Sequence, residues 1–264
     1  MNYLESLILG VIQGLTEFLP ISSSGHLEIF KVIFGSDLSN SESLLFTIIL
    51  HFATALSTIY YFKNDILKIF KGIINKKSDD VNFSKYILIS MIPAVLVGFF
   101  LEETIHVFFS GNLVLIGIML FLTGIFLLFT DFMKKGELHL NKKNSLFIGI
   151  AQAIAILPGI SRSGATIACA VLLGTNKENA TKFSFLMVVP IIFGSISKSL
   201  LDQKINFENF DFLIVFIGFC SAFFTGLFAC KWMIYLVKKS KLYYFAIYCF
   251  VVGSLVILIT NDLQ

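Results

Sequence analysis

The stretch EFLPISSSGHLEIF, residues 17–30, decides the fold. It interrupts a region that otherwise reads as helix in lipid, and it contains two carboxylates, three hydroxyls and an imidazole together with a proline and a glycine. An unwound backbone in hydrocarbon must line a polar cavity or be buried in protein, because each unpaired group costs on the order of several kcal/mol. The break therefore marks a cavity, and AILPGISRSGATIA, residues 155–168, predicts a second one.

The composition assigns the chain to the membrane. Of 264 residues, 56% are hydrophobic, 30 are Phe and only 14% are charged, which is too apolar for a soluble domain of this length. The apolar runs have helical length and lack the period-two alternation of outer-membrane barrels. We therefore expect an all-α polytopic membrane protein, with residues 1–264 forming a single membrane domain that contacts lipid and no nucleic acid.

Six segments are long and apolar enough to span a bilayer: residues 43–62, 86–101, 113–133, 182–201, 210–237 and 243–259. Two further apolar regions, 3–34 and 145–173, are too long for one span and too short for two spans with a turn. Both are interrupted near the middle by Pro, Gly and Ser. We interpret each as a re-entrant helix pair, which enters and leaves the membrane on one side.

The distribution of charge orients these segments. Three expected loops are rich in lysine: Lys63, Lys68, Lys71, Lys76, Lys77 and Lys85; Lys134, Lys135, Lys142 and Lys143; Lys238, Lys239 and Lys241. The opposite loops carry mostly acids: Glu102, Glu103, Asp202, Glu208 and Asp211, with Lys204. Lysine-rich loops are cytoplasmic by the positive-inside rule. The first re-entrant pair then lies on the outer side of the membrane and the second on the inner side.

An internal repeat supports these opposite orientations. A shift of 139 residues superposes a shared pattern, GxxQ, seven residues, then ISxSG: Gly10 on Gly149, Gln13 on Gln152, Ile21 on Ile160, Ser22 on Ser161, Ser24 on Ser163 and Gly25 on Gly164. Three spans, an odd number, follow each copy, so the second copy is inverted relative to the first. We expect an inverted-topology repeat with halves 1–133 and 142–264, whose broken helices meet near the midplane.

The residues after each break predict a phosphate site. Each second half-helix starts with Ser and Gly, and its free N–H groups and positive dipole end favour an anion. Arg162 is the only arginine in the chain, and a guanidinium inside a membrane is expensive and usually functional. The predicted phosphate-binding residues are Ser22, Ser24, Gly25, Ser161, Arg162, Ser163, Gly164 and Thr166.

The two copies differ in their reactive side chains, because Glu17, Ser23 and His26 align with Ile156, Arg162 and Ala165. Each copy alone therefore supplies only part of the reactive groups. We predict that Glu17, Ser23, His26 and Arg162 are catalytic and lie close together. Glu17 is open to three roles: cation ligand, general base, or counter-ion of Arg162. His26 is open to orienting or deprotonating Ser23, attacking as a nucleophile, or protonating a leaving group.

Gln13 and Glu17 are four residues apart and share one helix face. A carboxylate and an amide oxygen beside a phosphate suit a hard divalent cation, Mg²⁺ or Ca²⁺. By contrast, His51 in the first span is interpreted as a packing residue, and Pro93 and Pro190 as kinks within spans.

QGLTEFLPISSSGH and LPGISRSGAT, followed by FSFLMVVP, resemble the signatures of the bacterial undecaprenyl pyrophosphate phosphatase family, also called the bacitracin-resistance family. The resemblance covers essentially the whole chain. It implies an enzyme that removes the terminal phosphate of undecaprenyl pyrophosphate and returns the carrier lipid to peptidoglycan synthesis. It also implies a divalent cation, an active site open to the outer (periplasmic) side of the cytoplasmic membrane, and a homodimer.

Carried over by position, the glutamate-rich motif of the family corresponds to Gln13 and Glu17, its serine and histidine to Ser23 and His26, and its arginine motif to Ser161, Arg162, Ser163 and Thr166. Many members have glutamate where this chain has Gln13, so Glu17 should carry most of the metal binding. The choice of nucleophile between Ser23 and His26 stays open. An alternative function also stays open, because inverted repeats with broken helices occur in transporters as well. The same site suits a flippase for polyprenyl phosphates.

Overall fold

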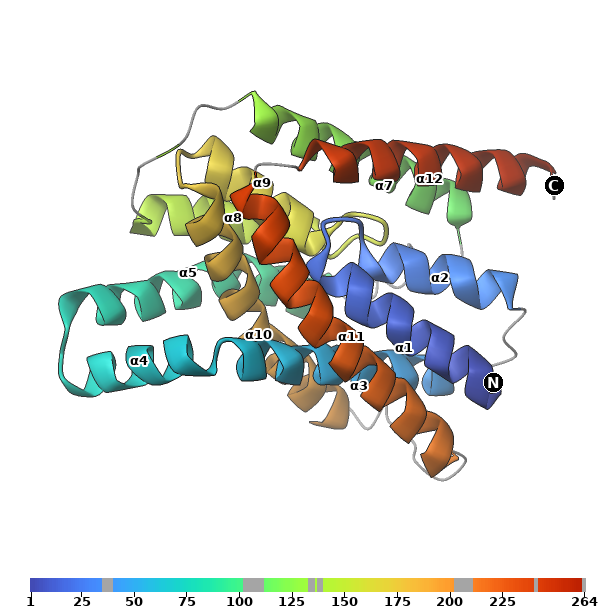
Figure 1. The fold of residues 1–264 in the computed structure, drawn as a ribbon, viewed down its shortest axis with the longest axis horizontal. Coiled ribbons are helices and arrows are strands. Elements are labelled where there is room, and N and C mark those ends of the chain that lie inside the picture. Colours follow the sequence, from blue (N-terminus) through green and yellow to red (C-terminus); the bar gives the residue numbers. More distant parts are fainter. Residues whose placement is uncertain are drawn as a thin grey trace.

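All secondary structure in the described part of the chain is helical (Figure 1). The computed structural model describes residues 1–34, 40–101, 112–132, 136, 140–201, 211–239 and 242–262. Its helices are α1 (Tyr3–Phe18), α2 (Ser23–Ile33), α3 (Asn40–Tyr61), α4 (Lys63–Ile74), α5 (Ser78–Phe100), α7 (Leu113–Asp131), α8 (Lys142–Ile154), α9 (Arg162–Leu172), α10 (Lys177–Leu201), α11 (Phe212–Lys238) and α12 (Tyr243–Asp262).

Six of these helices are long and apolar enough to cross a membrane: α3, α5, α7, α10, α11 and α12. They correspond one to one with the six expected spans. Two of them start earlier than the apolar runs, α5 at Ser78 and α10 at Lys177. Acidic residues in the first turn of α5, Asp79 and Asp80, interact favourably with the helix dipole, so this helix extends beyond its apolar part.

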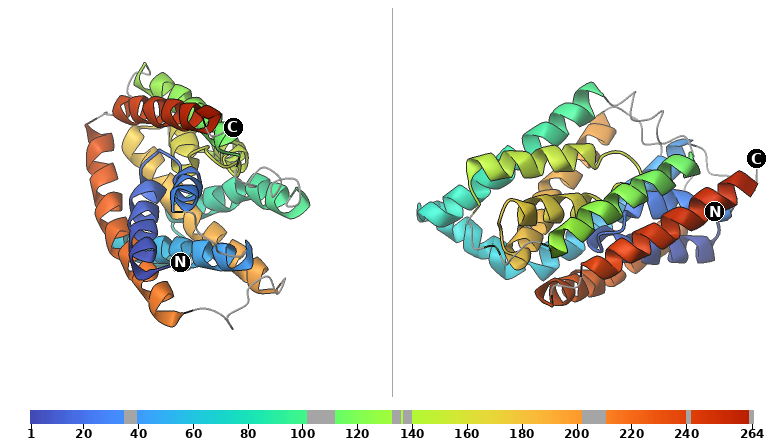
Figure 2. Two further views of the ribbon diagram at one scale, coloured as in Figure 1. Left: turned by 90° about the vertical axis from the view of Figure 1, so that its right-hand side faces the viewer. Right: turned by 90° about the horizontal axis from the view of Figure 1, so that it is seen from above.

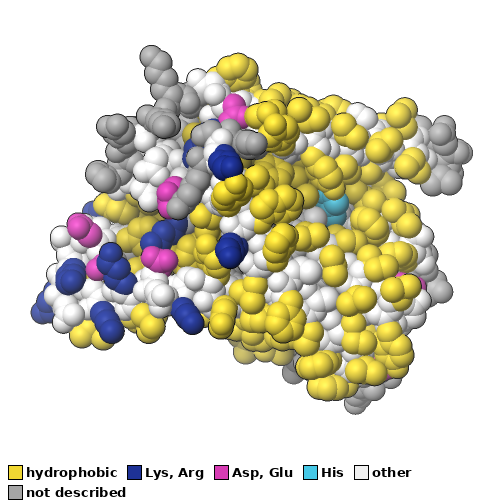
Figure 3. Space-filling model, viewed as in Figure 1, with side chains coloured by type: hydrophobic (Ala, Val, Ile, Leu, Met, Phe, Trp, Pro, Cys, Tyr) yellow, Lys and Arg dark blue, Asp and Glu magenta, His cyan; other side chains and the backbone are white. Residues whose placement is uncertain are grey.

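The lysine-rich segment between the first two spans is not the loop that we expected. It forms α4 and the first turns of α5. Ile66 and Ile69 pack against the core from the inner face of α4, while Lys68 and Lys71 are exposed. Mean hydropathy along the sequence misses such an amphipathic helix, because the polar residues of one face offset the apolar residues of the other. Figure 3 shows lysine side chains concentrated at this end of the molecule, and mainly hydrophobic side chains elsewhere on the same face.

Other residues used for the topology lie outside the described part of the chain: Lys134, Lys135, Lys204, Lys241, Glu102, Glu103, Asp202 and Glu208. The described lysines near the expected cytoplasmic ends of the spans include Lys63, Lys76, Lys142 and Lys239. The topology proposed below rests on these residues.

Both predicted breaks are present, one between α1 and α2 and one between α8 and α9. The shared ISxSG pattern encodes the start of the second helix in each pair. The Ser22 hydroxyl accepts a hydrogen bond from the Gly25 N–H (3.2 Å), and the Ser161 hydroxyl accepts one from the Gly164 N–H (3.1 Å). Serine is a preferred N-cap because its oxygen satisfies a free backbone N–H.

The repeated glycine of GxxQ allows a close helix contact in each half. A Cβ atom on Gly10 would lie 2.5 Å from the Gly218 carbonyl oxygen of α11. A Cβ atom on Gly149 would lie 2.4 Å from the Ser90 carbonyl oxygen of α5. Thus α1 packs on α11 and α8 packs on α5. The last helices of the two expected halves, α7 and α12, lie side by side along one edge (Figures 1 and 2).

The two breaks touch each other. The Ser163 hydroxyl donates to the Leu19 carbonyl oxygen at 3.3 Å, and a Cβ atom on Gly25 would lie 3.2 Å from the Cα atom of Gly159. Gly159 has a φ of +89°, which L side chains rarely adopt, so glycine is required here for both space and conformation. Residues about 140 positions apart in the sequence therefore form one polar centre.

Candidate active site

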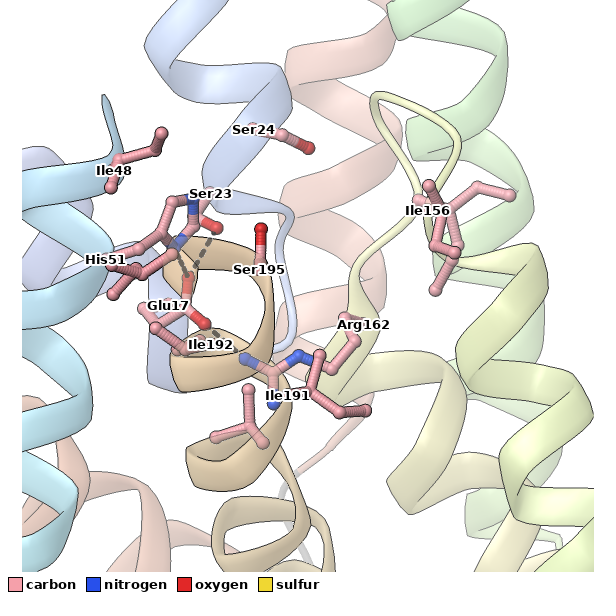
Figure 4. Close-up of a pocket in the computed structure, with 14 residues that line it drawn as sticks. Glu17, Ser23, Ser24, Ile48, His51, Ile156, Arg162, Ile191, Ile192 and Ser195 are labelled. Carbon is pink, nitrogen blue, oxygen red and sulfur yellow. Dashed lines mark hydrogen bonds and ion pairs between the residues drawn. The ribbon is translucent and has the colours of Figure 1, made fainter. Parts of the chain in front are cut away.

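Glu17 is the centre of the polar cluster at the breaks (Figure 4). Its Oε1 atom forms an ion pair with the Arg162 guanidinium from the other half of the chain. Its Oε2 atom accepts hydrogen bonds from the Ser23 hydroxyl (2.8 Å) and the Gln13 amide nitrogen (3.0 Å). The structure thus brings together three of the four predicted catalytic residues, and both predicted cation ligands, at one carboxylate.

Helix ends position these groups. Glu17 is in the last turn of α1, Ser23 is the first residue of α2, and Arg162 is the first residue of α9. Gln13 lies one turn before Glu17 on the same face, as the four-residue spacing predicts. Glu17, Ser23 and Arg162 therefore lie where a helix ends or begins, next to a break that the N-cap serines stabilise.

A pocket of about 240 Å³ adjoins this cluster. Its polar side chains include Glu17, Ser23, Ser24, Arg162 and Ser195. The rest of the lining is almost entirely aliphatic: Ile48 from α3, Ala155, Ile156 and Ile160 from the second break, and Val188, Ile191, Ile192 and Ile196 from α10. A pocket lined by both charged groups and branched apolar side chains suits a ligand with an anionic head and a hydrocarbon chain.

Arg162 retains binding capacity beyond its ion pair. Its Nη2 atom contacts Glu17, while its Nη1 atom is buried and has no hydrogen-bond partner among the described residues. A buried donor without a partner is costly, so a guanidinium nitrogen at a pocket wall is a ready site for an anionic oxygen. Charged residues of both halves meet here, as the sequence comparison of the two breaks predicts.

The structure does not place His26 among the pocket-lining residues. The residue is 4% exposed, and its Nδ1 atom lies 2.7 Å from the Ser22 carbonyl oxygen. Its Nε2 atom lies 2.8 Å from the Tyr248 hydroxyl of α12, and the two rings stack. The carbonyl requires a proton on Nδ1, so Nε2 accepts from Tyr248. Both ring nitrogens are therefore engaged within the protein.

Most of the predicted phosphate-binding residues stabilise the breaks instead of lining the pocket. Only Ser24 and Arg162 of that set are pocket residues. Ser22, Gly25, Ser161 and Gly164 form the two helix caps, and Ser163 bonds to Leu19. Thr166 donates to the Arg162 carbonyl oxygen at 2.8 Å and lies 2.6 Å from the Ser184 hydroxyl. These contacts fix the backbone that carries the guanidinium.

His51 is a site residue that the sequence analysis missed. It lines the pocket from α3, and its Nδ1 atom lies 2.9 Å from the Gln13 amide nitrogen and 3.3 Å from Glu17 Oε2. The interpretation of His51 as a packing residue is therefore wrong. The signal was present, because an ionisable residue within a span is a functional candidate by the same argument that identified Arg162.

The donor set fits a cation that is shared with a bound phosphate. The Gln13 amide oxygen is buried and without a hydrogen-bond partner among the described residues, while the amide nitrogen of the same side chain is 3.0 Å from Glu17 Oε2. Amide and carboxylate oxygens are suitable ligands for Mg²⁺, which usually completes its shell with water and substrate phosphates. Within the described residues no group of three or more His, Cys, Asp or Glu is arranged to hold a metal alone.

The fold and the site together define a class: helical membrane proteins with a partly polar pocket where two breaks between helices meet. The chain belongs to a known family. A family model described as "Bacitracin resistance protein BacA" matches residues 6–255. The chain is therefore a multi-pass membrane protein, with six apolar helices of spanning length in its described part.

Curated relatives cover nearly the whole chain. A protein of Christiangramia forsetii named "Undecaprenyl-diphosphatase" is 53% identical over 254 residues, which is 96% of each chain. Proteins with the same name are 45% identical in Bacteroides thetaiotaomicron, over 98% of this chain and 99% of the relative, and 44% identical in Parabacteroides distasonis, over 98% and 99%.

Proposed function

We propose that this protein is an integral membrane phosphatase that hydrolyses undecaprenyl diphosphate to undecaprenyl phosphate and inorganic phosphate, and so recycles the carrier lipid of peptidoglycan synthesis. The proposal rests on the contact of Glu17 with Ser23 and Arg162 in a pocket whose other lining is mostly aliphatic. The family and the names of the curated relatives support the same reaction.

The substrate would lie with its diphosphate against Arg162 and its isoprenoid chain along the isoleucines of α3 and α10. The free Nη1 atom of Arg162 and the N-terminal turns of α2 and α9 would bind the phosphate oxygens. These groups orient the terminal phosphorus toward Ser23 and stabilise charge on the transferring phosphoryl group.

Ser23 is the better-placed nucleophile of the two candidates, because it lines the pocket and His26 does not. Its hydroxyl donates to Glu17 Oε2, so the carboxylate accepts the proton as Ser23 Oγ bonds to the terminal phosphorus. The anhydride P–O bond breaks and undecaprenyl phosphate leaves. Water then attacks the phosphoserine, releases inorganic phosphate, and the proton returns to Ser23.

Gln13 and Glu17 would hold a divalent cation through the amide oxygen and the carboxylate. When bound, this cation supplies positive charge that neutralises the phosphate oxygens.

The finer architecture is also a proposal: two re-entrant pairs, α1–α2 and α8–α9, in halves of inverted topology. The packing supports it, because α1 packs on α11 and α8 packs on α5. The partner helices α11 and α5 occupy the same place in the two halves, since each is the second span of its half. The described lysines support cytoplasmic loops on one side. The site would then open to the periplasmic side. A homodimer is expected from the family resemblance alone.

Phosphate release by the purified protein tests the function. Protein in detergent is given undecaprenyl or farnesyl diphosphate, with undecaprenyl monophosphate as a control that lacks the anhydride bond. We expect one equivalent of phosphate from each diphosphate and none from the monophosphate. Tight binding of the diphosphate without phosphate release would reject the phosphatase and favour the flippase, which none of the relatives described above supports by name.

A further inference from the structure

His51 stands out among the pocket residues because its two ring nitrogens have different surroundings. Its Nδ1 atom lies next to Gln13 and Glu17, at 2.9 and 3.3 Å. Its Nε2 atom has no hydrogen-bond partner among the described residues, and the side chain is 29% exposed at the pocket. Figure 4 shows the imidazole beside Ser23, on the side of Glu17 opposite Arg162.

Gln13 determines which nitrogen of His51 carries the proton. The Gln13 amide nitrogen is 3.0 Å from Glu17 Oε2 and 2.9 Å from His51 Nδ1. A carboxylate only accepts, so one N–H of this amide donates to Glu17. Nδ1 is 2.9 Å from the same amide nitrogen and 3.3 Å from Glu17 Oε2, and the shorter contact assigns Nδ1 as the acceptor of the second N–H. Nδ1 is therefore an acceptor, and the neutral imidazole has its proton on Nε2.

The result is an N–H donor that projects into an anion-binding pocket. It differs from His26, whose Nε2 atom accepts from Tyr248 and whose Nδ1 proton is used by a carbonyl. Arg162 and His51 flank Glu17, so a phosphate held at Arg162 and attacked by Ser23 would have His51 within the same cluster.

We infer that His51 is a substrate-binding residue whose Nε2–H donates a hydrogen bond to the terminal phosphate, and that Gln13 holds it in this tautomer. The inference rests on the proposed phosphatase function and names an additional phosphate donor in that site. It also gives Gln13 a positioning role besides any cation binding.

Two amide substitutions separate this role from a structural one. In His51→Gln the amide nitrogen takes the place of Nε2, whereas in His51→Asn it takes the place of Nδ1. Removing one such donor from an active site lowers turnover by about 100-fold or more. We expect His51→Gln to keep kcat/KM within about fivefold of the unmodified protein, and His51→Asn to lose about 100-fold. Tyr60→Phe, at an exposed position on the same helix, is the control and should be unchanged.

The relative activities of the His51 variants test the inference. Equal activity of His51→Asn and His51→Gln, or near-normal activity of His51→Leu, would overturn it while leaving the phosphatase function intact. Absence of phosphate release from the unmodified protein would instead reject the proposed function. If His51→Leu does not fold, the two amide variants still provide the comparison.

Imidazole nitrogen spectroscopy tests the tautomer directly. The chain has four histidines, so selective ¹⁵N labelling gives few signals, and the pair lost in His51→Gln belongs to His51. We expect a protonated Nε2, an unprotonated Nδ1, and a shift of Nε2 when inorganic phosphate is added at an inhibitory concentration. A proton on Nδ1, or an Nε2 signal that inhibitory phosphate leaves unchanged, would contradict the inference.

Discussion

Replacing Arg162 with lysine keeps a positive charge opposite Glu17 but removes the second donor nitrogen. In the structure Nη2 is used by Glu17, which leaves Nη1 for the substrate. A single ammonium cannot reproduce this planar pair of donors, so it either stays with Glu17 or moves to the phosphate. The variant therefore loses one charge-assisted hydrogen bond, of about 1.5–3 kcal/mol.

That loss corresponds to a decrease in kcat/KM of about 10- to 150-fold, since each 1.36 kcal/mol is tenfold in rate. The assay is initial-rate phosphate release from farnesyl diphosphate in detergent, with the unfolding temperature measured in parallel. Lys68→Arg makes the opposite exchange at an exposed position of α4 and should leave kcat/KM unchanged. An Arg162→Lys protein that folds normally and keeps more than a third of its kcat/KM would refute the assignment of Nη1 to the phosphate.

Three further predictions concern the nucleophile, the helix contacts and the cation. Ser23→Ala should abolish turnover, and acid quenching of the unmodified protein with ³²P-labelled substrate should trap a labelled phosphoserine; substantial turnover of the variant would exclude Ser23. Gly10→Ala should lower the stability by about 1–3 kcal/mol, because its Cβ would lie 2.5 Å from the Gly218 carbonyl oxygen, a backbone atom, whereas Gly98→Ala, with nothing within 4 Å, should not lower the unfolding temperature. A chelator should suppress phosphate release and Mg²⁺ should restore it, and full activity in the chelator would argue against a cation at Gln13 and Glu17.

The parts of the fold that depend on local pattern were predictable from the sequence. Apolar length identified the six spans, and the ISxSG repeats located both breaks because Ser and Gly there satisfy local capping requirements. The comparison of the two copies also identified Glu17 and Arg162 as complementary, since a buried carboxylate and a buried guanidinium each need a partner.

Long-range contacts other than those that the internal repeat implies were not predictable. Spacing shows which side chains share a helix face, but not what lies opposite that face. His26 follows Ser23 closely in the sequence and yet faces Tyr248 of α12, while His51 comes to Glu17 from a separate span. The aliphatic wall of α10, including Ile191 and Ile192, has the composition of any lipid-facing helix until the fold shows that it lines the pocket.

The central claim is that Ser23 from the first half and Arg162 from the second half act on the same phosphate. A structure of the protein with a methylene-bridged diphosphonate analogue of the substrate tests this most directly. We expect the terminal phosphonate to lie about 2.7–3.1 Å from the Arg162 guanidinium and to contact the Ser23 hydroxyl. A phosphonate bound by one half of the chain only, with Ser23 or Arg162 out of contact, would contradict it.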